Sequence, residues 1–195
     1  MRAWIFAAAL AVAGAAHAEP VSYTLDPAHT QVAFVVDRFG FNRVLGRFED
    51  VTGELVLDEE NPANSSVRAS IQIASVDSSN DTRDEHLRGE RWLNAAQFPT
   101  MEFRSTGVRL TGDTTAEVTG DLTLLGQTHP VTLDVTLNNI GGPPNAPTRR
   151  MAGFSATGSL TRSVWGSTTA AAPGMIGDMV SITIEALAVP VEAAN

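Results

Sequence analysis

The sequence contains no cysteine, and all 13 of its basic residues are arginine, because lysine is absent as well. A chain without cysteine forms neither disulfides nor thiolate zinc sites, and a chain without lysine forms no Schiff base. Its formal net charge is -9 at pH 7. Nucleic acid is therefore not an expected partner, since neutralising phosphates requires clustered basic residues.

Long hydrophobic runs are also scarce, and the clearest one lies at the N-terminus. Residues 1–18 combine Arg2, an apolar run over residues 4–13 and the small-x-small sequence Ala16-His17-Ala18. This order is typical of a cleavable signal peptide, and the run is shorter than the roughly 20 residues of a membrane-spanning helix. We expect cleavage after Ala18 and export of one soluble domain over residues 19–195.

Period-two alternation dominates the rest of the chain. Residues 131–138 place Val and Leu on one face and Thr, Asp and Asn on the other, and residues 115–124 alternate in the same way. One polar face indicates antiparallel pairing, because parallel strands are usually buried on both faces. The pattern predicts an all-β barrel or sandwich of about eight strands. The further expected strands are residues 30–36, 53–57, 67–73, 101–105, 151–160 and 180–188.

Two segments depart from this alternation. Residues 77–93 are polar and contain helix formers, and Asn80 or Asp81 can cap a helix there. We predict one short helix whose apolar residues face the barrel, namely Leu87, Trp92 and Leu93. Residues 140–150 contain Gly-Gly-Pro-Pro and a further proline, which predicts a loop.

The alternation is compatible with two kinds of barrel interior, one hollow and one filled. Small residues share the inward faces with Val, Leu and Ile, which leaves volume for an apolar ligand; they are Ala69, Ala116, Gly120, Ala186 and Ala188. In the alternative, large side chains fill a solid barrel, and the candidates are Phe34, Phe39, Phe41, Phe103, Phe154 and Trp165. Periodicity assigns residues to faces and not to volumes, so it does not decide between the two.

Six segments, taken in order and spacing, resemble the YceI family of periplasmic polyisoprenoid-binding proteins. The second contains Gly46-Arg47-Phe48, the third Thr82-Arg83-Asp84 and the last Arg162-Ser163-x-Trp165-Gly166. The similarity covers essentially all of residues 22–188. The six segments span residues 23–34, 46–48, 82–87, 98–105, 120–131 and 162–166.

The resemblance implies a lipocalin-like antiparallel β-barrel with an elongated apolar interior. It implies an isoprenoid-chain ligand, such as a polyprenyl quinone or polyprenyl phosphate, a periplasmic location, and a homodimer as one candidate assembly. It also implies that Arg83 and Asp84 hold the helix against the barrel. No cofactor beyond the bound lipid is expected.

Ligand-binding residues are predicted on the inner faces and at one strand end. Arg38 and Arg43, with Arg47, flank two phenylalanines near the end of an expected strand, where they would suit an anionic or carbonyl head group at the pocket entrance. The predicted set is Phe34, Val36, Arg38, Phe39, Phe41, Arg43, Phe103, Leu122, Phe154 and Trp165.

The sequence offers little support for a catalytic or metal-binding site. His29, His86 and His129 lie on three separate expected elements, which does not match the spacing of a metal site. No Gly-x-Ser-x-Gly elbow or phosphate-binding glycine loop occurs. We therefore expect neither a metal site nor catalytic residues, and not an enzyme.

The leading hypothesis is a periplasmic carrier or buffer for a long-chain isoprenoid lipid, in transient contact with a membrane or a membrane redox protein. A second hypothesis is a filled-barrel interaction module whose loops, including residues 140–150, dock a membrane redox partner. A third is an enzyme acting on a bound isoprenoid, for which Asp26, His29 and His129 would be tested first.

Overall fold

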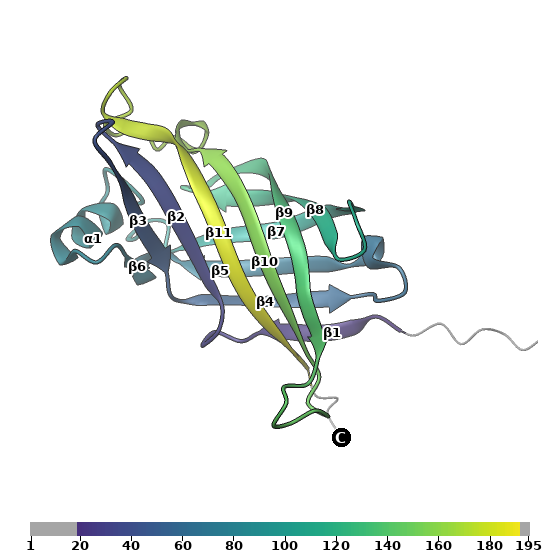
Figure 1. The fold of residues 1–195 in the computed structure, drawn as a ribbon. Coiled ribbons are helices and arrows are strands. Elements are labelled where there is room, and N and C mark those ends of the chain that lie inside the picture. Colours follow the sequence, from purple (N-terminus) through teal and green to yellow (C-terminus); the bar gives the residue numbers. More distant parts are fainter. Residues whose placement is uncertain (1–18, 192–195) are drawn as a thin grey trace, which may run out of the picture.

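The computed structural model describes residues 19–191, so the predicted signal peptide lies outside the described residues. Within this range the chain forms one curved sheet of eleven strands, with one α-helix at one end (Figure 1). The strands are β1 (Val21–Leu25), β2 (Gln31–Arg38), β3 (Asn42–Phe48), β4 (Val51–Leu57), β5 (Ser66–Gln72), β6 (Val76–Asp77), β7 (Thr100–Leu110), β8 (Thr115–Leu124), β9 (Gln127–Gly141), β10 (Met151–Thr161) and β11 (Ile176–Pro190). The helices are α1 (Asp81–Arg88) and the 3-10 turns η1 (Pro62–Asn64), η2 (Ile73–Ser75) and η3 (Arg162–Trp165).

Eight of the strands close into a ring, which confirms the predicted antiparallel barrel. The hydrogen-bonded order is β1-β4-β5-β7-β8-β9-β10-β11, and β11 returns to β1 through pairs such as Leu25 with Ala188. All of these pairs are antiparallel. Closure leaves no open edge within the ring itself.

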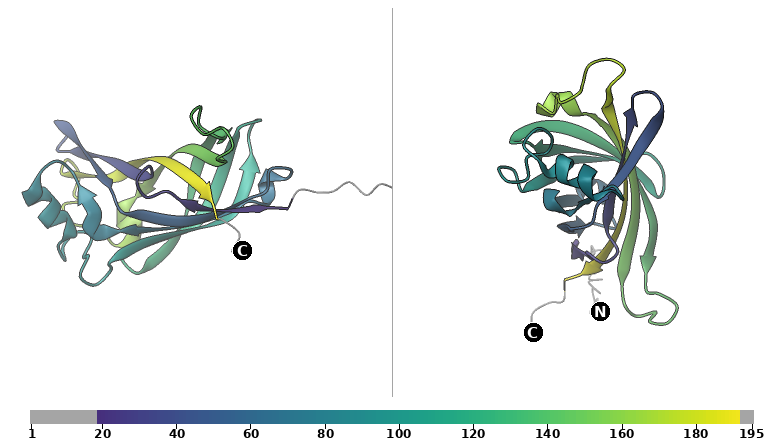
Figure 2. Two further views of the ribbon diagram at one scale, coloured as in Figure 1. Left: turned by 90° about the horizontal axis from the view of Figure 1, so that it is seen from below. Right: turned by 90° about the vertical axis from the view of Figure 1, so that its left-hand side faces the viewer.

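The remaining strands extend the wall at the α1 end. Strand β11 pairs with β1 only near its C-terminal end, and its earlier residues, Ile176 to Glu185, pair with β2. Strand β3 then pairs with β2, and the two-residue β6 pairs with β3 (Figure 2). Along β11, the neighbouring strand is therefore β2 at the α1 end of the barrel and β1 at the other end.

The β8–β9 hairpin shows how local sequence sets the register. Val131 and Leu133 are buried, whereas Thr132 and Asp134 between and beyond them are exposed. The turn is Leu125-Gly126, with φ of 52° and 73° at the two positions. Two consecutive left-handed residues fit the twist of antiparallel strands, and glycine adopts this conformation at little cost.

Helix α1 begins where the sequence predicts. The Asn80 side chain accepts a hydrogen bond from the backbone N–H of Arg83 at 2.9 Å, so it caps the first turn. The buried Asp84 carboxylate accepts from the backbone N–H of Ser78 at 2.9 Å, and the Arg83 Nε donates to the Ser78 hydroxyl at 2.7 Å. These bonds hold α1 to the strand β6 segment, as the resemblance implies for Arg83 and Asp84. No helix among residues 19–191 is long and apolar enough to cross a membrane.

The buried residues form two clusters. The larger one contains Phe48, Ile71, Leu122 and Trp165 and lies under η3 and α1. The smaller one surrounds Tyr23, which is completely buried together with Ala152 and Ala188. Burial of these apolar surfaces stabilises the barrel wall, and many of the residues in the larger cluster also line the cavity described next.

Candidate functional site: an apolar cavity inside the barrel

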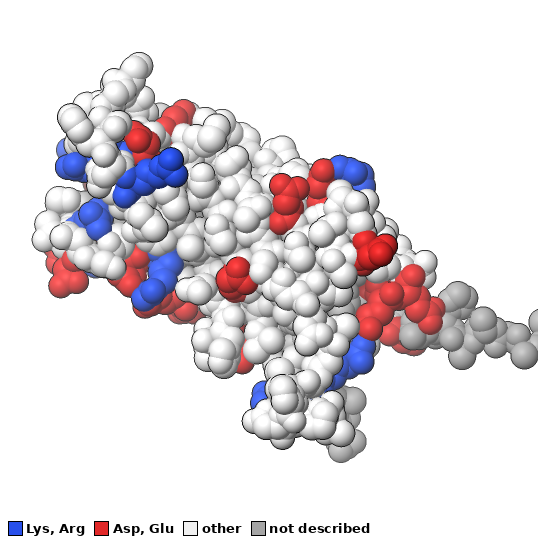
Figure 3. Space-filling model, in the orientation of Figure 1, with Lys and Arg blue, Asp and Glu red and all other residues white. Residues whose placement is uncertain are grey.

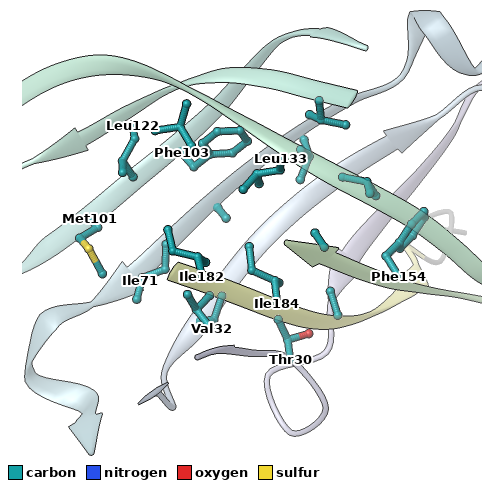
Figure 4. Close-up of a pocket in the computed structure, with 18 of the residues that line it drawn as sticks. Thr30, Val32, Ile71, Met101, Phe103, Leu122, Leu133, Phe154, Ile182 and Ile184 are labelled. Carbon is teal, nitrogen blue, oxygen red and sulfur yellow. The ribbon is translucent and has the colours of Figure 1, made fainter. Parts of the chain in front are cut away.

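The barrel encloses a cavity of about 520 Å³. Val32, Ile182 and Ile184 come from one side of the wall, and Phe103 and Leu133 from the other, and their side chains point toward a shared interior (Figure 4). Nearly all the middle of the wall is aliphatic or aromatic, with the Thr30 hydroxyl as an exception. The volume lies within the usual range of small-molecule pockets, roughly 300–1,000 Å³. The interior is therefore not filled along this length, contrary to the solid-barrel hypothesis.

One end of the cavity, which we call the open end, is lined by exposed polar residues. They belong to the β4–β5 connection, the start of β5 and the β7–β8 hairpin, and they include Glu59, Ser66, Asp113 and Thr114. Acidic side chains gather on this end of the surface, with arginines among them (Figure 3). Of the two acidic residues at this rim, Glu59 is paired with Arg150.

The opposite end, which we call the closed end, is covered by α1, η3 and the segment that follows each. Leu87, Trp92 and Leu93 line it, so the predicted inward face of the helical segment is confirmed. Arg162 is 6% exposed, and its guanidinium donates to the backbone carbonyls of Ser167, Gly177 and Ile176 at 2.6, 2.9 and 3.1 Å. Burial lowers the pKa of Arg162 from its ordinary value, but an arginine remains protonated at neutral pH. These contacts join η3 to Ser167 and to the first two residues of β11 at the closed end.

Five of the ten predicted ligand-binding residues line the cavity. They lie on four strands, β2, β7, β8 and β10, and they contribute aromatic or branched aliphatic side chains; the five are Phe34, Val36, Phe103, Leu122 and Phe154. The structure thus brings together side chains that are more than a hundred residues apart in sequence. Their contact with a ligand stays a prediction, and their position in the wall is a finding.

The other predicted residues near the β2–β3 hairpin do not line the cavity. Strand β2 ends at Arg38, so Phe39 and Phe41 lie in the turn beyond the wall, and Phe41 is 90% exposed. Arg43 is exposed on the outer face of β3, because the neighbouring Val44 takes the buried position. Arg38, Phe39, Phe41 and Arg43 are thus absent from the cavity lining, and a pocket entrance at these residues stays a prediction. Arg47 also faces outward, where it pairs with Glu49 and Asp77.

Trp165 is the remaining predicted ligand contact, and it belongs to the packed core instead. It is 3% exposed, and its indole N–H donates to the backbone carbonyl of Leu122 at 3.0 Å. The His129 ring packs edge-on against it, with the ring centroids 5.2 Å apart. Since η3 fixes this side chain against β8, Trp165 supports the wall without lining the cavity.

The histidines occupy separate places. His29 pairs with Asp26 at 2.9 Å on the exposed connection between β1 and β2, and this hydrogen bond lowers the pKa of Asp26. His129 contacts Trp165, as described above. In the part of the chain that the structure describes, no three His, Asp or Glu side chains are grouped in a way that could hold a metal ion.

Sequence reasoning missed both polar ends of the cavity. Glu59 and Asp113 lie in connections outside the alternating segments, so periodicity carried no signal for them. Arg162 belongs to the last of the six segments that resemble the family, but nothing in that segment indicates that its guanidinium reaches the cavity end. The missed apolar residues, such as Val32 and Ile184, did share the inward parity of predicted strands and could have been found by that signal.

Comparison with known proteins assigns the family. The YceI-like domain matches residues 23–188. The chain belongs to the YceI-like family. Protein YceI of Escherichia coli O6:H1 is 39% identical over 155 residues, which is 80% of each chain, and Protein YceI of Salmonella agona is 36% identical over 180 residues, covering 92% of this chain and 93% of the relative.

Solved structures share the YceI-like fold. Burkholderia cenocepacia BcnA superposes with a TM-score of 0.75 at 23% identity, covering 84% of this chain and 98% of that one. A polyisoprenoid binding domain from Saccharophagus degradans, implicated in plant cell wall breakdown, has a TM-score of 0.62 at 14% identity and covers 88% and 99% of the two chains. At these identities the likeness establishes the fold alone.

Proposed function

We propose that this YceI-like protein is a periplasmic carrier or buffer for a long-chain isoprenoid lipid, and not an enzyme. The observation that carries the proposal is the apolar cavity inside the closed barrel, with polar residues confined almost entirely to its two ends. Such an interior favours a hydrocarbon chain, because each buried CH₂ contributes about 0.8 kcal/mol. The solved domain from Saccharophagus degradans, which is described as polyisoprenoid binding, supports an isoprenoid as the ligand class.

The cavity also supports a binding role over a catalytic one. A reaction on the bound chain would require an acid, base or nucleophile beside it, and the middle of the wall offers the Thr30 hydroxyl among aliphatic and aromatic groups. Asp26 and His29, considered above as candidates, pair with each other on the exposed β1–β2 connection. They support the loop, and we assign them no catalytic role.

Binding is tested by titrating the purified protein with a long-chain polyprenol while recording tryptophan fluorescence. Trp92 lines the cavity and reports occupancy, whereas Trp165 is packed behind the wall. We expect a saturable change in emission that is lost in Trp92→Phe. A titration with no saturable signal, together with no prenyl lipid in an organic extract of protein from its exporting cells, would overturn the carrier proposal.

The carrier proposal includes transient contact with a membrane, through an exposed apolar tip formed by Phe41, Met175 and Met179. The backbone N–H of Phe39 donates to the carbonyl of Met175 at 2.7 Å, which joins the β2–β3 hairpin to the segment before β11. Arg38 and Arg43 are exposed beside it. At the upper left of Figure 3, where the β2–β3 hairpin and the start of β11 lie in Figure 1, the outermost projection carries no charged side chain. Aromatic and sulfur side chains flanked by arginine suit the surface of an anionic bilayer.

Membrane contact is tested by flotation with vesicles of phosphatidylglycerol and phosphatidylcholine. We expect the bound fraction to fall in Phe41→Ser and to be unchanged in Leu110→Ser, an exposed apolar residue at the other end. If the Phe41→Ser and wild-type proteins floated with the vesicles to the same extent, the tip would not be the membrane contact. Assembly into a homodimer stays a prediction, which analytical ultracentrifugation checks.

A further inference from the structure

Three glycines on the inner wall allow large neighbouring side chains to lie against the backbone. A Cβ added to Gly46 would lie 2.3 Å from the Phe34 ring, one added to Gly120 would lie 2.4 Å from the Phe103 ring, and one added to Gly158 would lie 2.7 Å from Leu133. Contacts under 3.0 Å essentially never occur for a real Cβ. Each glycine therefore marks a recess that a cavity-lining side chain already occupies.

The Gly46 recess has the simplest geometry. Gly46 on β3 is the direct partner of Phe34 on β2, so both residues face the interior at the same level. The three atoms nearest to an added Cβ all belong to the Phe34 ring. Phe48, two residues along β3, packs against the same ring with centroids 5.7 Å apart. The ring is thus held along the wall, over a backbone that has no side chain of its own.

The other two recesses repeat the arrangement on distant strands. Phe103 on β7 lies over Gly120 on β8, and Leu133 on β9 lies over Gly158, its direct partner on β10. Phe34, Phe103 and Leu133 all line the cavity. Glycine within a strand costs stability, and close approach of another group is a common reason for its presence. A covering aromatic ring offsets part of that cost.

We propose that these glycine recesses set the bore of the cavity and so determine which lipid chains it accepts. With glycine at these three positions, the side chains of Phe34, Phe103 and Leu133 lie against the backbone of the wall and leave the middle of the barrel clear. A methyl group at Gly46 would turn the Phe34 ring away from the wall and into the cavity. The inference deepens the proposed function, on which its ligand part rests, because a narrower bore discriminates between chain types.

The recesses matter most for a branched chain. A polyisoprenoid carries a methyl group on every isoprene unit, so it is wider than a linear acyl chain of equal length. A side chain that enters the bore therefore obstructs the isoprenoid before it obstructs the linear chain. Gly46 is the position to test, because Gly120 also lies 2.6 Å from the Arg104 carbonyl when extended by a Cβ, and backbone gives way less readily than a ring.

The test compares Gly46→Ala with the double variant Gly46→Ala/Phe34→Leu, in which a smaller side chain relieves the clash. Gly107→Ala is the matched control, because it makes the same change in a strand where an added Cβ meets nothing within 4 Å. Each protein is titrated with a polyprenol and with a linear fatty alcohol of equal chain length. We expect Gly46→Ala to weaken polyprenol binding about tenfold or more and the linear alcohol less, since overpacking is costly. The double variant should recover most of the loss.

Crystal structures of the Gly46→Ala and wild-type proteins separate this inference from the carrier proposal. If the wild-type protein binds neither alcohol, the carrier proposal fails, and the position of the Phe34 ring alone then decides the inference. A ring displaced into the cavity supports the recess, and a ring that stays against β3 overturns it. The inference would also be overturned if Gly46→Ala bound each of the two alcohols with the same affinity as the wild-type protein.

Discussion

The barrel contains two regions built from the same kinds of residue, one filled and one hollow. Around Tyr23, the alanines Ala152 and Ala188 are completely buried, because the phenol occupies the space beside them. Two residues earlier on the same face of β11, Ala186 lines the cavity. A small side chain therefore creates a cavity only where no large neighbour enters the space it leaves.

The filled region should lose the most stability when its central side chain is removed. Tyr23→Ala deletes a completely buried ring, and we expect a loss of about 3–5 kcal/mol in the free energy of unfolding, measured by urea denaturation. Tyr23→Phe is the control, because it removes only the hydroxyl that accepts a 3.3 Å hydrogen bond from Arg150. Similar losses for the two variants would show that the ring does not fill this region.

The two alanines of β11 offer a matched pair for the comparison. Ala188→Leu inserts volume into the filled region and should cost about 1–3 kcal/mol of unfolding free energy. Ala186→Leu places the same volume in the cavity, where we expect a smaller cost and weaker polyprenol binding. Denaturation and fluorescence titration of both proteins measure the contrast. Equal destabilisation at the two positions would remove the distinction between the regions.

The wall behind the cavity depends on one buried hydrogen bond. Trp165→Phe keeps an aromatic ring but leaves the Leu122 carbonyl without the indole N–H that it accepts at 3.0 Å. Loss of one buried hydrogen bond costs about 0.5–1.5 kcal/mol, so the melting temperature should fall. Val164→Ala, at a neighbouring exposed position, should change it little. An unchanged melting temperature in Trp165→Phe would contradict the supporting role.

The smallest expected effect is a pH dependence at the closed end. The Asp178 carboxylate accepts hydrogen bonds from the Ser163 backbone N–H at 2.9 Å and hydroxyl at 2.7 Å, and these bonds lower its pKa. A lowered folded-state pKa stabilises the protein above the ordinary carboxyl pKa, about 3.9, and the stabilisation is lost as pH falls through the folded value. Asp178→Asn should therefore lower the melting temperature at pH 7, and the difference from wild type should shrink at acid pH. A difference that is constant from pH 7 to pH 3 would refute this assignment.

The sequence predicted the barrel well because its outer face is exposed to solvent, which produces a clear alternation of polar and apolar residues. The alternation in β8 and β9, the short helix and its Asn80 cap were all confirmed. Three strands escaped prediction for local reasons. Strand β3 carries two arginines and a glycine, β6 has two residues, and β1 is a short strand with one fully buried side chain, Tyr23.

The cavity was harder to predict because volume depends on partners across the sheet. Gly120 was expected to leave space, but the Phe103 ring lies over it, and Ala188 was expected to do the same, but Tyr23 fills the region. Ala69, Ala116 and Ala186 do line the cavity. Nothing in the local pattern separates these two groups, since the register of neighbouring strands decides which large side chain meets which small one.

The central claim is that the hollow region holds an isoprenoid chain, and native mass spectrometry of protein purified from its own exporting cells tests it most directly. We predict a fraction of wild-type protein that carries one lipid with the mass of a prenyl chain compound, and a smaller fraction in Ala186→Leu. Wild-type protein observed only without lipid, under conditions that preserve the fold, would contradict the claim.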